Sequence, residues 1–235
     1  MDIARSVREA IPDIHREGWP FIAVTLALAI LFAFVFPPLF WLLAIVAGWM
    51  AIFFRDPVRV VPTSHGLVVS PADGRIEPIV AAVPPPEFGL GTEPMTRISV
   101  FMNVFDCHIN RAPVAGRVAR IAYKAGKFLS ADLDKASEAN ERNSLLIEAA
   151  GGARVGVVQI AGLVARRILC WTSEGAELAI GERIGMIRFG SRLDVYLPEG
   201  SLVVVGAGQR AIAGETVIAL LPGAEFRPPL SLRRD

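Results

Sequence analysis

The hydrophobic pattern divides the chain near residue 54. Residues 21–36 and 39–54 form two uncharged apolar runs, and Pro37-Pro38 separates them. A straight helix needs about 20 residues to cross a bilayer, and a Pro-Pro pair interrupts helical hydrogen bonding. Two interpretations fit this pattern. One is a helical hairpin that enters and leaves the membrane by the same face, and the other is a single kinked, tilted span.

Basic residues on both sides of the apolar stretch favour the hairpin. They are Arg5, Arg8 and Arg16 before it and Arg55 and Arg59 after it. Positive charge marks the cytoplasmic side of a membrane segment, so we expect both ends of the hairpin in the cytoplasm. This predicts a protein of the cell inner membrane whose remaining chain lies on the cytoplasmic face. The stretch is too long for a cleavable signal peptide, whose apolar region spans about 7–15 residues.

The segment before the hairpin has a helical pattern of its own. Within residues 3–17, apolar residues recur at helical spacing, with charges between them: Ile3, Val7, Ile11 and Ile14. This pattern is typical of an amphipathic helix on a membrane surface. Pro12 interrupts it, so a solvated N-terminal arm is the alternative. Residues 1–54 are thus predicted to form an amphipathic helix followed by a membrane-anchoring hairpin.

From residue 58 onward the pattern changes to short runs rich in valine and isoleucine, punctuated by Gly, Pro and Asp, which indicates strands. Residues 205–219 have the glycine-punctuated pattern of a biotinyl/lipoyl-like barrel-sandwich. We therefore predict a mainly β barrel-sandwich domain over residues 55–235, with a helix or long loop at 131–140. The expected strands are Leu67–Ser70, Arg75–Val83, Thr96–Phe101, Gly116–Ala122, Ser144–Ala149, Arg154–Ile160, Arg183–Ile187, Asp194–Leu197 and Val217–Leu220.

Composition and charge exclude several classes of function. A net charge of +1 gives no electrostatic case for binding nucleic acid. The two cysteines, Cys107 and Cys170, are far apart, and the chain has three histidines. We therefore expect neither a metal site nor a disulfide framework. The sequence leaves open whether the chain forms a homodimer.

Gly190-Ser191 is the pair with the most distinctive chemistry. A serine hydroxyl can attack the preceding carbonyl and convert the amide to an ester. β-Elimination then cuts the chain and leaves a dehydroalanine, which hydrolyses to a pyruvoyl group. On its own, a Gly-Ser pair is more often a β-turn.

Three further motifs change that reading. They are Ser70-Pro-Ala-Asp-Gly-Arg-Ile76, the segment from Phe101 to Arg117 that contains Asp-Cys-His-Ile-Asn-Arg, and Tyr123-Lys-Ala-Gly-Lys127 with Asn140-Glu-Arg-Asn143 downstream. With Gly190-Ser191, and in this order, they resemble the phosphatidylserine decarboxylase family in its short, proteobacterial form. The resemblance covers roughly residues 55 to 225. Several motifs in order are a far more specific signal than any one of them.

The resemblance implies the function. Cleavage between Gly190 and Ser191 would give chains of 190 and 45 residues, with Ser191 converted to a covalent, self-generated pyruvoyl cofactor. Its carbonyl would form a Schiff base with the amine of phosphatidylserine in the membrane and accept the electrons released with CO₂. The product would be phosphatidylethanolamine. Two alternatives are a decarboxylase of a related serine-headed lipid, such as archaetidylserine, and a non-enzymatic membrane-anchored lipoyl-like adaptor.

The resemblance also assigns roles to Asp73 and His108. The aspartate would orient a histidine that activates the serine, although Asp73-Gly74 alone is typical of a hairpin turn. The long form of the family has a second histidine three residues after the first, where this chain has Arg111. Arginine cannot act as a general base at neutral pH. Either His108 serves both self-cleavage and decarboxylation, or another group activates Ser191.

Four basic residues are candidates for binding the substrate phosphate or carboxylate: Arg111, Arg142, Lys124 and Lys127. A guanidinium suits bidentate contacts with such anions. The alternative for each is a solvated basic face.

Overall fold

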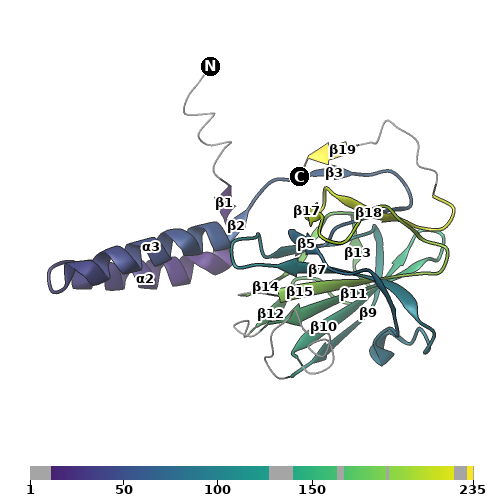
Figure 1. Ribbon diagram of the computed structural model, residues 1–235, viewed down its shortest axis with the longest axis horizontal. Coiled ribbons are helices and arrows are strands. Elements are labelled where there is room, and N and C mark those ends of the chain that lie inside the picture. Colours follow the sequence, from purple (N-terminus) through teal and green to yellow (C-terminus); the bar gives the residue numbers. More distant parts are fainter. Residues whose placement is uncertain (1–11, 127–139, 163–166, 189–190, 225–231, 235) are drawn as a thin grey trace, which may run out of the picture. The chain divides into compact units, whose positions relative to one another are not determined.

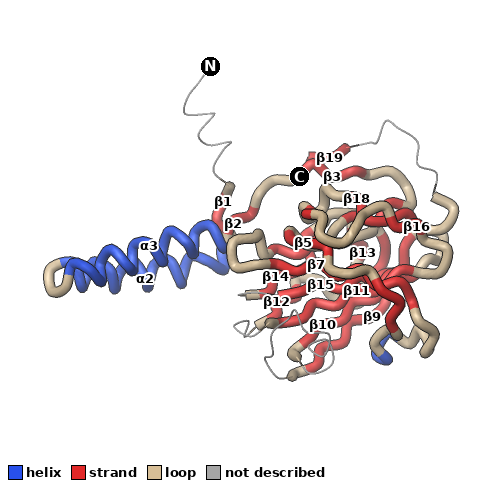
Figure 2. The backbone as a smooth tube through the Cα atoms, viewed as in Figure 1, coloured by secondary structure: helices blue, strands red, loops and turns tan. Residues whose placement is uncertain are grey.

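The computed structural model describes residues 12–126, 140–162, 167–188, 191–224 and 232–234. Its contacts divide the chain into two units, Met1–Val58 and Arg59–Asp235. Figure 2 shows that the two long helices belong to the first unit and that the second is built mainly from strands.

The first unit is a helical hairpin of α2 (Trp19–Ala33) and α3 (Pro37–Phe53). The two helices lie side by side (Figure 1). Pro37 and Pro38 occupy the first positions of α3, where a missing N–H costs no helical hydrogen bond. The Pro-Pro pair thus ends the first apolar run and starts the second, as expected for a hairpin.

Two side-chain contacts hold the helices together. The Thr25 hydroxyl lies 3.5 Å from the sulfur of Met50, and the ring of Phe21 stacks on Phe54 with centroids 5.5 Å apart. These contacts join residues far apart in the sequence, which a single kinked span does not do.

The segment before the hairpin differs from the expected amphipathic helix. Strand β1 (Asp13–Ile14) pairs antiparallel with β2 (Arg55–Asp56), and Arg16–Gly18 form the short 3₁₀ helix η1. The His15 amide donates to the Phe54 carbonyl at 2.8 Å, so pairing with the chain after α3 replaces helical bonds here. The rest of the predicted helix, residues 3–11, lies outside the described residues.

The hairpin exposes an apolar surface. The run Arg16–Ala33 is 18 residues long with a mean hydropathy of 1.4, which is long and apolar enough to cross a membrane. Helix α3 is one residue shorter. Large apolar side chains of the hairpin are exposed, among them Phe34 and Ile45. An exposed apolar surface of this kind fits association with a membrane.

The second unit is organised around one large antiparallel sheet that curls into a half-barrel (Figure 1). Its strands, in spatial order, are β13 (Glu177–Leu178), β9 (Gly116–Lys124), β10 (Arg142–Ala149), β11 (Arg154–Ala161), β15 (Ser191–Leu197), β7 (Met95–Met102), β5 (Gly74–Ile76) and β17 (Arg210–Ala211), and β6 (Val80–Ala82) also pairs with β7. The predicted mainly β barrel-sandwich domain with an N-terminal helical hairpin is confirmed.

Smaller sheets and one 3₁₀ turn complete the unit. The sheets are β12 (Ile168–Cys170) with β14 (Arg183–Ile187) and β8 (Ile109–Arg111), β16 (Leu202–Val203) with β18 (Val217–Leu220) and β4 (Leu67–Val69), and β19 (Leu232–Arg234) with β3 (Val60–Pro62), and the turn is η2 (Pro86–Phe88). The strand expected at Arg75–Val83 is two strands, β5 and β6. Pro78 lies between them and has no N–H to donate to a ladder. The segment expected at 131–140 lies outside the described residues apart from Asn140.

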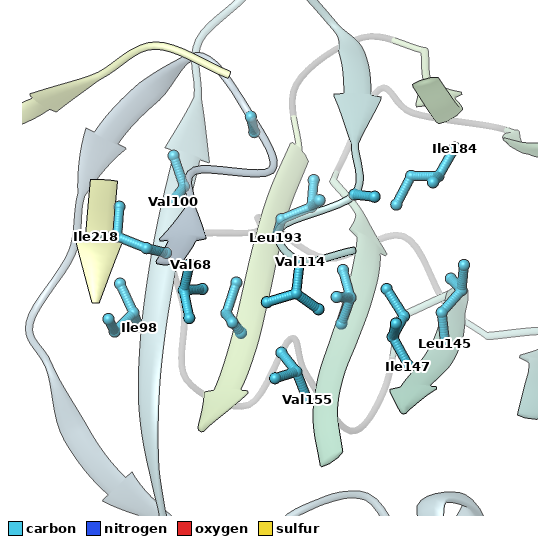
Figure 3. Packing of buried hydrophobic residues seen from close by; sticks show 14 of the residues in the cluster. Val68, Ile98, Val100, Val114, Leu145, Ile147, Val155, Ile184, Leu193 and Ile218 are labelled. Carbon is cyan, nitrogen blue, oxygen red and sulfur yellow. The ribbon is translucent and has the colours of Figure 1, made fainter. Parts of the chain in front are cut away.

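Both faces of the large sheet are buried along its central strand β15. Along β15, Leu193, Val195 and Leu197 belong to the main core, part of which Figure 3 shows. The intervening residue Tyr196 packs on the opposite face, in a cluster with Phe88. Side chains alternate between the faces of a strand, and Ser191 has the same parity as Leu193. Ser191 therefore lies on the core face, which we call the inner face.

Candidate active site

Ser191 is the first residue of a central strand. Its register partners are Ala161 on β11 and Met102 on β7. The residue is fully buried, and its hydroxyl oxygen lies 3.9 Å from the Met102 sulfur. Gly190, the other half of the predicted cleavage pair, lies outside the described residues. The predicted reactive hydroxyl thus sits within the fold, away from bulk water.

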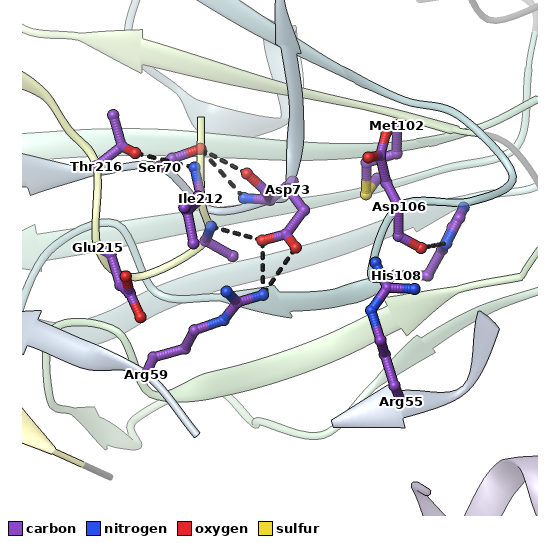
Figure 4. Close-up of polar contacts among 12 residues, drawn as sticks. Arg55, Arg59, Ser70, Asp73, Met102, Asp106, His108, Ile212, Glu215 and Thr216 are labelled. Carbon is purple, nitrogen blue, oxygen red and sulfur yellow. Dashed lines mark hydrogen bonds and ion pairs between the residues drawn. The ribbon is translucent and has the colours of Figure 1, made fainter. Parts of the chain in front are cut away.

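His108 is fully buried, immediately before β8. Its Nδ1 lies 2.9 Å from the backbone carbonyl oxygen of Asp106 (Figure 4). A carbonyl only accepts hydrogen bonds, so Nδ1 carries the proton, and in the neutral ring Nε2 is left as the acceptor. The imidazole is therefore oriented in the tautomer that a general base needs.

The turn that holds His108 is itself tied down. One carboxylate oxygen of Asp106 accepts a hydrogen bond from the Asn103 amide at 2.9 Å, and the other pairs with Arg210. This turn joins Met102, the neighbour of Ser191, to His108. Arg210 lies after the predicted cleavage point, so the contact links the two predicted chains.

Asp73 has different partners from those the resemblance implies. Arg59 donates to both of its carboxylate oxygens, at 2.8 and 2.7 Å, and the Ala213 amide donates to one of them at 2.8 Å (Figure 4). The imidazole Nδ1 of His108 is occupied by a main-chain carbonyl instead. Asp73 therefore ties together segments on the two sides of the predicted cut. Its neighbour Gly74 lets β5 approach β7, because a Cβ there would lie 2.1 Å from the Phe101 carbonyl oxygen.

Arg111 is buried rather than placed on a basic surface. Only 1% of it is exposed, and its guanidinium donates to the Gly181 carbonyl at 2.9 Å. Its backbone amide donates to the Pro71 carbonyl at 2.9 Å. The residue that replaces the long form's second histidine thus connects the Asp73 turn, through its backbone, to the segment before β14, through its side chain.

Arg142 begins β10 and forms a bidentate ion pair with Glu87, with N–O distances of 2.8 and 3.0 Å. Ser144 donates to the same carboxylate. Burial by itself raises the pKa of Glu87. The net pKa is nevertheless below its usual value, because the carboxylate accepts hydrogen bonds from its own backbone amide, Ser144 and Arg142 and lies beside the charge of Arg142. Lys124 is exposed and is the register partner of Arg142 on β9. Lys127 lies outside the described residues.

A cavity of about 420 Å³ lies beside Arg142. Its polar lining is Arg97, Arg142, Asp194 and Tyr196, and residues 82–86 form one wall. Burial, followed by the nearby charge of Asp194, raises the pKa of the Tyr196 phenol. Tyr196 packs on the face opposite the main core. The structure therefore does not bring Arg142 together with Ser191, because the large sheet separates them.

Three buried carboxamides near Ser191 were missed by sequence reasoning. Asn143 donates to the Gln159 side-chain oxygen at 2.9 Å, and Gln159 donates to the Asn110 side-chain oxygen at 2.8 Å. Asn110 Nδ2 lies 3.7 Å from the Met102 sulfur, the atom that Ser191 also contacts. For Asn143 and Gln159, the available signal was a polar residue at an inward position of a strand whose neighbouring inward positions, Leu145 and Val157, are apolar.

Gly185 allows this packing. A Cβ there would lie 2.2 Å from the Leu169 carbonyl oxygen and 3.0 Å from Gln159 Nε2. Gly185 is the register partner of Asn110. The small sheet of β8, β12 and β14 can therefore lie closely over the carboxamides only because this position has no side chain.

A comparison with known families identifies the family of this chain. The model of the family described as phosphatidylserine decarboxylase matches residues 46–219, which is more than half of the chain and includes Asp73, His108 and Ser191. The chain belongs to the phosphatidylserine decarboxylase family. It is therefore a decarboxylase, a lyase of phospholipid biosynthesis, and the family's substrate is phosphatidylserine. The adaptor alternative does not account for this match.

Proposed function

We propose that this decarboxylase cuts its own chain between Gly190 and Ser191 and converts phosphatidylserine to phosphatidylethanolamine with the pyruvoyl group so formed. The observation that carries the proposal is the position of Ser191. It is a fully buried serine at the first residue of central strand β15, within the region that the family model matches.

Self-cleavage begins at the Ser191 hydroxyl. Its oxygen attacks the carbonyl carbon of Gly190, and the hydroxyl proton passes to Nε2 of His108. The same proton then passes to the departing nitrogen as the peptide C–N bond breaks, which leaves an ester and a free amine. A base then removes the Ser191 Cα proton, the Cβ–O bond breaks, and Gly190 leaves as a carboxylate. The resulting dehydroalanine takes up water and loses ammonia, which gives the pyruvoyl group. His108 suits the role of base because Asp106 already holds the required tautomer.

The surroundings of Ser191 fit this group. When formed, the pyruvoyl group supplies the sink for the electron pair left by departing CO₂. Strand β15 pairs with β11 and β7 on its two sides, and both belong to the 190-residue chain. The 45-residue chain would thus stay in the sheet with its first residue fixed in place. Further ties are the Ala213 amide on Asp73 and the Val60 amide on Glu215 at 3.0 Å.

Substrate contacts are proposed separately for each basic residue. Arg142, Lys124 and Lys127 are kept as candidates for the phosphate or carboxylate. For Arg111 we favour support of the fold, because its guanidinium is buried against Gly181. Asp73 is proposed to hold the two chains together through Arg59 and Ala213, and so to act on the histidine indirectly.

The hairpin is proposed to anchor the enzyme in the cell inner membrane with the β domain on the cytoplasmic face. The uncharged helices and the basic residues that flank them support this orientation. Such an anchor would hold the β domain beside the headgroups of its lipid substrate.

Intact mass spectrometry of the purified protein tests the proposal. We expect chains of 190 and 45 residues, the smaller one blocked to Edman sequencing by its pyruvoyl end. A single uncut chain in active enzyme would overturn it. Vesicles that contain phosphatidylserine or an archaetidylserine-like lipid, assayed in parallel, identify the preferred serine-headed lipid.

A further inference from the structure

A line of three buried carboxamides crosses the inner face of the large sheet and ends at Met102, whose sulfur Ser191 also contacts. Asn143 lies on β10, Gln159 on β11 and Asn110 on β8, and each is 2% exposed or less. Leu145 and Val157, two residues away on the same face, are apolar core residues. Burying an amide costs free energy unless its polar atoms are hydrogen-bonded, so polar residues here call for an explanation.

The hydrogen bonds give this line a direction. Asn143 donates to Gln159 Oε1, and Gln159 donates to Asn110 Oδ1. Because its oxygen is already an acceptor for Gln159, Asn110 has its NH₂ group directed toward Met102, with 3.7 Å between Nδ2 and Sδ. The line thus fixes which end of the Asn110 amide approaches the Ser191 site.

The last acceptor in the line is weak. A thioether sulfur accepts hydrogen bonds poorly, yet the same Met102 sulfur is the partner of both Asn110 Nδ2 and the Ser191 hydroxyl. Asn140 is a useful contrast. It is also fully buried, but it donates to the Ala161 carbonyl oxygen at 2.7 Å. Asn140 is satisfied by the fold, whereas the Asn110 amide keeps a donor that a better acceptor can take.

We propose that the Nδ2 amide of Asn110 is a catalytic residue of self-cleavage, the hydrogen-bond donor that stabilises negative charge at the Ser191 oxygen. Gln159 and Asn143 are positioning residues that hold this amide toward the serine. The inference rests on the proposed function and adds to it a donor that complements the base. Negative charge develops on this oxygen when the Cβ–O bond breaks and the oxygen leaves as part of the Gly190 carboxylate, and Asn110 gives up only a sulfur contact to reach it.

The first experiment compares two isosteric substitutions, Asn110→Leu and the matched control Asn140→Leu. The full-length precursor is synthesised in detergent, and conversion of the 235-residue chain to two chains is followed on gels. Loss of a donor aimed at developing charge slows a reaction about 100-fold or more, so we expect that loss for Asn110→Leu and a much smaller one for Asn140→Leu. Both substitutions are also made in Ser191→Ala, which stays uncut, so that melting temperatures report on the fold alone.

The second experiment uses the pH dependence of Asn110→Asp. A protonated carboxyl group can donate to the serine oxygen, whereas an ionised one cannot and also repels the developing charge. Cleavage by Asn110→Asp should therefore fall as pH rises. The wild type should not show this fall, because the Asn110 amide does not ionise. A purely structural role for Asn110 does not add such a fall to the pH profile.

The outcomes separate this inference from the proposed function. If the wild type cuts itself and Asn110→Leu does so equally fast, the inference is overturned and the proposed function stands. Equal slowing by Asn140→Leu, or parallel pH profiles for Asn110→Asp and wild type, also overturns it. A wild-type enzyme that decarboxylates without being cut overturns the proposed function itself.

Discussion

His108 is held by the main chain of Asp106, with 2.9 Å between Nδ1 and the carbonyl oxygen. In many hydrolytic sites a carboxylate performs this task. Here the carboxylate of Asp106 instead stabilises the turn that presents the carbonyl, through the Asn103 amide and Arg210. The orientation of the histidine thus depends on the shape of a turn.

Substitution of His108 tests whether one histidine serves both reactions. We expect His108→Ala to slow both self-cleavage and decarboxylation by the cleaved fraction, each by roughly 10²–10⁴-fold, the usual contribution of a general base. Gel analysis of the precursor and turnover per cleaved chain measure the two effects separately. Normal cleavage by the variant would refute the dual role.

Arg111→His asks whether the long form's second histidine can be restored. Arg111 and Asn110 are adjacent on β8, and adjacent side chains of a strand point to opposite faces. Asn110 faces Met102, the neighbour of Ser191, while the Arg111 guanidinium reaches Gly181. We therefore expect Arg111→His not to rescue the cleavage of His108→Ala. Rescue, measured as two chains on a gel, would place position 111 within reach of the serine.

The contacts of Asp73 predict that it holds the two cleaved chains together. If Asp73 acts by holding Arg59 and the Ala213 amide, Asp73→Asn and Arg59→Gln should weaken the association of the cleaved chains to a similar degree. Each should slow cleavage by less than about tenfold, because neither removes a group that takes the proton. Native mass spectrometry in increasing denaturant measures the association. A large cleavage defect for Asp73→Asn alone would restore the role implied by the family resemblance.

The sequence predicted most of the architecture because its signals are local. The two uncharged runs around Pro37-Pro38 predict the helical hairpin, and the valine-rich segments predict the strands. Strand β8 was missed because it has three residues, two of them polar, and its pairing with β14 is a tertiary contact. The contacts of Asp73 with Ala213 and of Asn110 with Gln159 were missed for the same reason, because the partners lie 140 and 49 positions away in the sequence.

The Glu87–Arg142 pair predicts a pH-dependent contribution to stability. The folded pKa of Glu87 is lowered, so the stabilisation is present above the unfolded pKa of about 4.3 and is lost as pH falls through the folded pKa. Glu87→Gln should lower the melting temperature at pH 7. The difference in melting temperature between this variant and the wild type should shrink below about pH 4. Glu77→Gln is the control, because its partner Arg75 is mostly exposed and such pairs contribute little.

The same pair also decides between two roles for Arg142. If Arg142 mainly supports the fold, Arg142→Gln and Glu87→Gln should lower the melting temperature alike and leave KM for phosphatidylserine unchanged. If it binds the lipid headgroup, Arg142→Gln alone should raise KM, since a charge-assisted hydrogen bond to substrate is lost. Parallel thermal melts and vesicle kinetics distinguish the two.

Removal of residues 1–58 separates chemistry from membrane attachment. The remaining unit, Arg59–Asp235, keeps the contacts of Ser191, His108 and Asp73 described above. It should therefore still cut itself into two chains. Turnover on phosphatidylserine vesicles should fall by roughly tenfold or more, because an anchor raises the effective concentration of enzyme at the lipid surface. Turnover on a short-chain phosphatidylserine dissolved as monomers should stay near that of the full chain, since this substrate needs no membrane. Loss of self-cleavage on truncation would mean that the hairpin helps to build the active site.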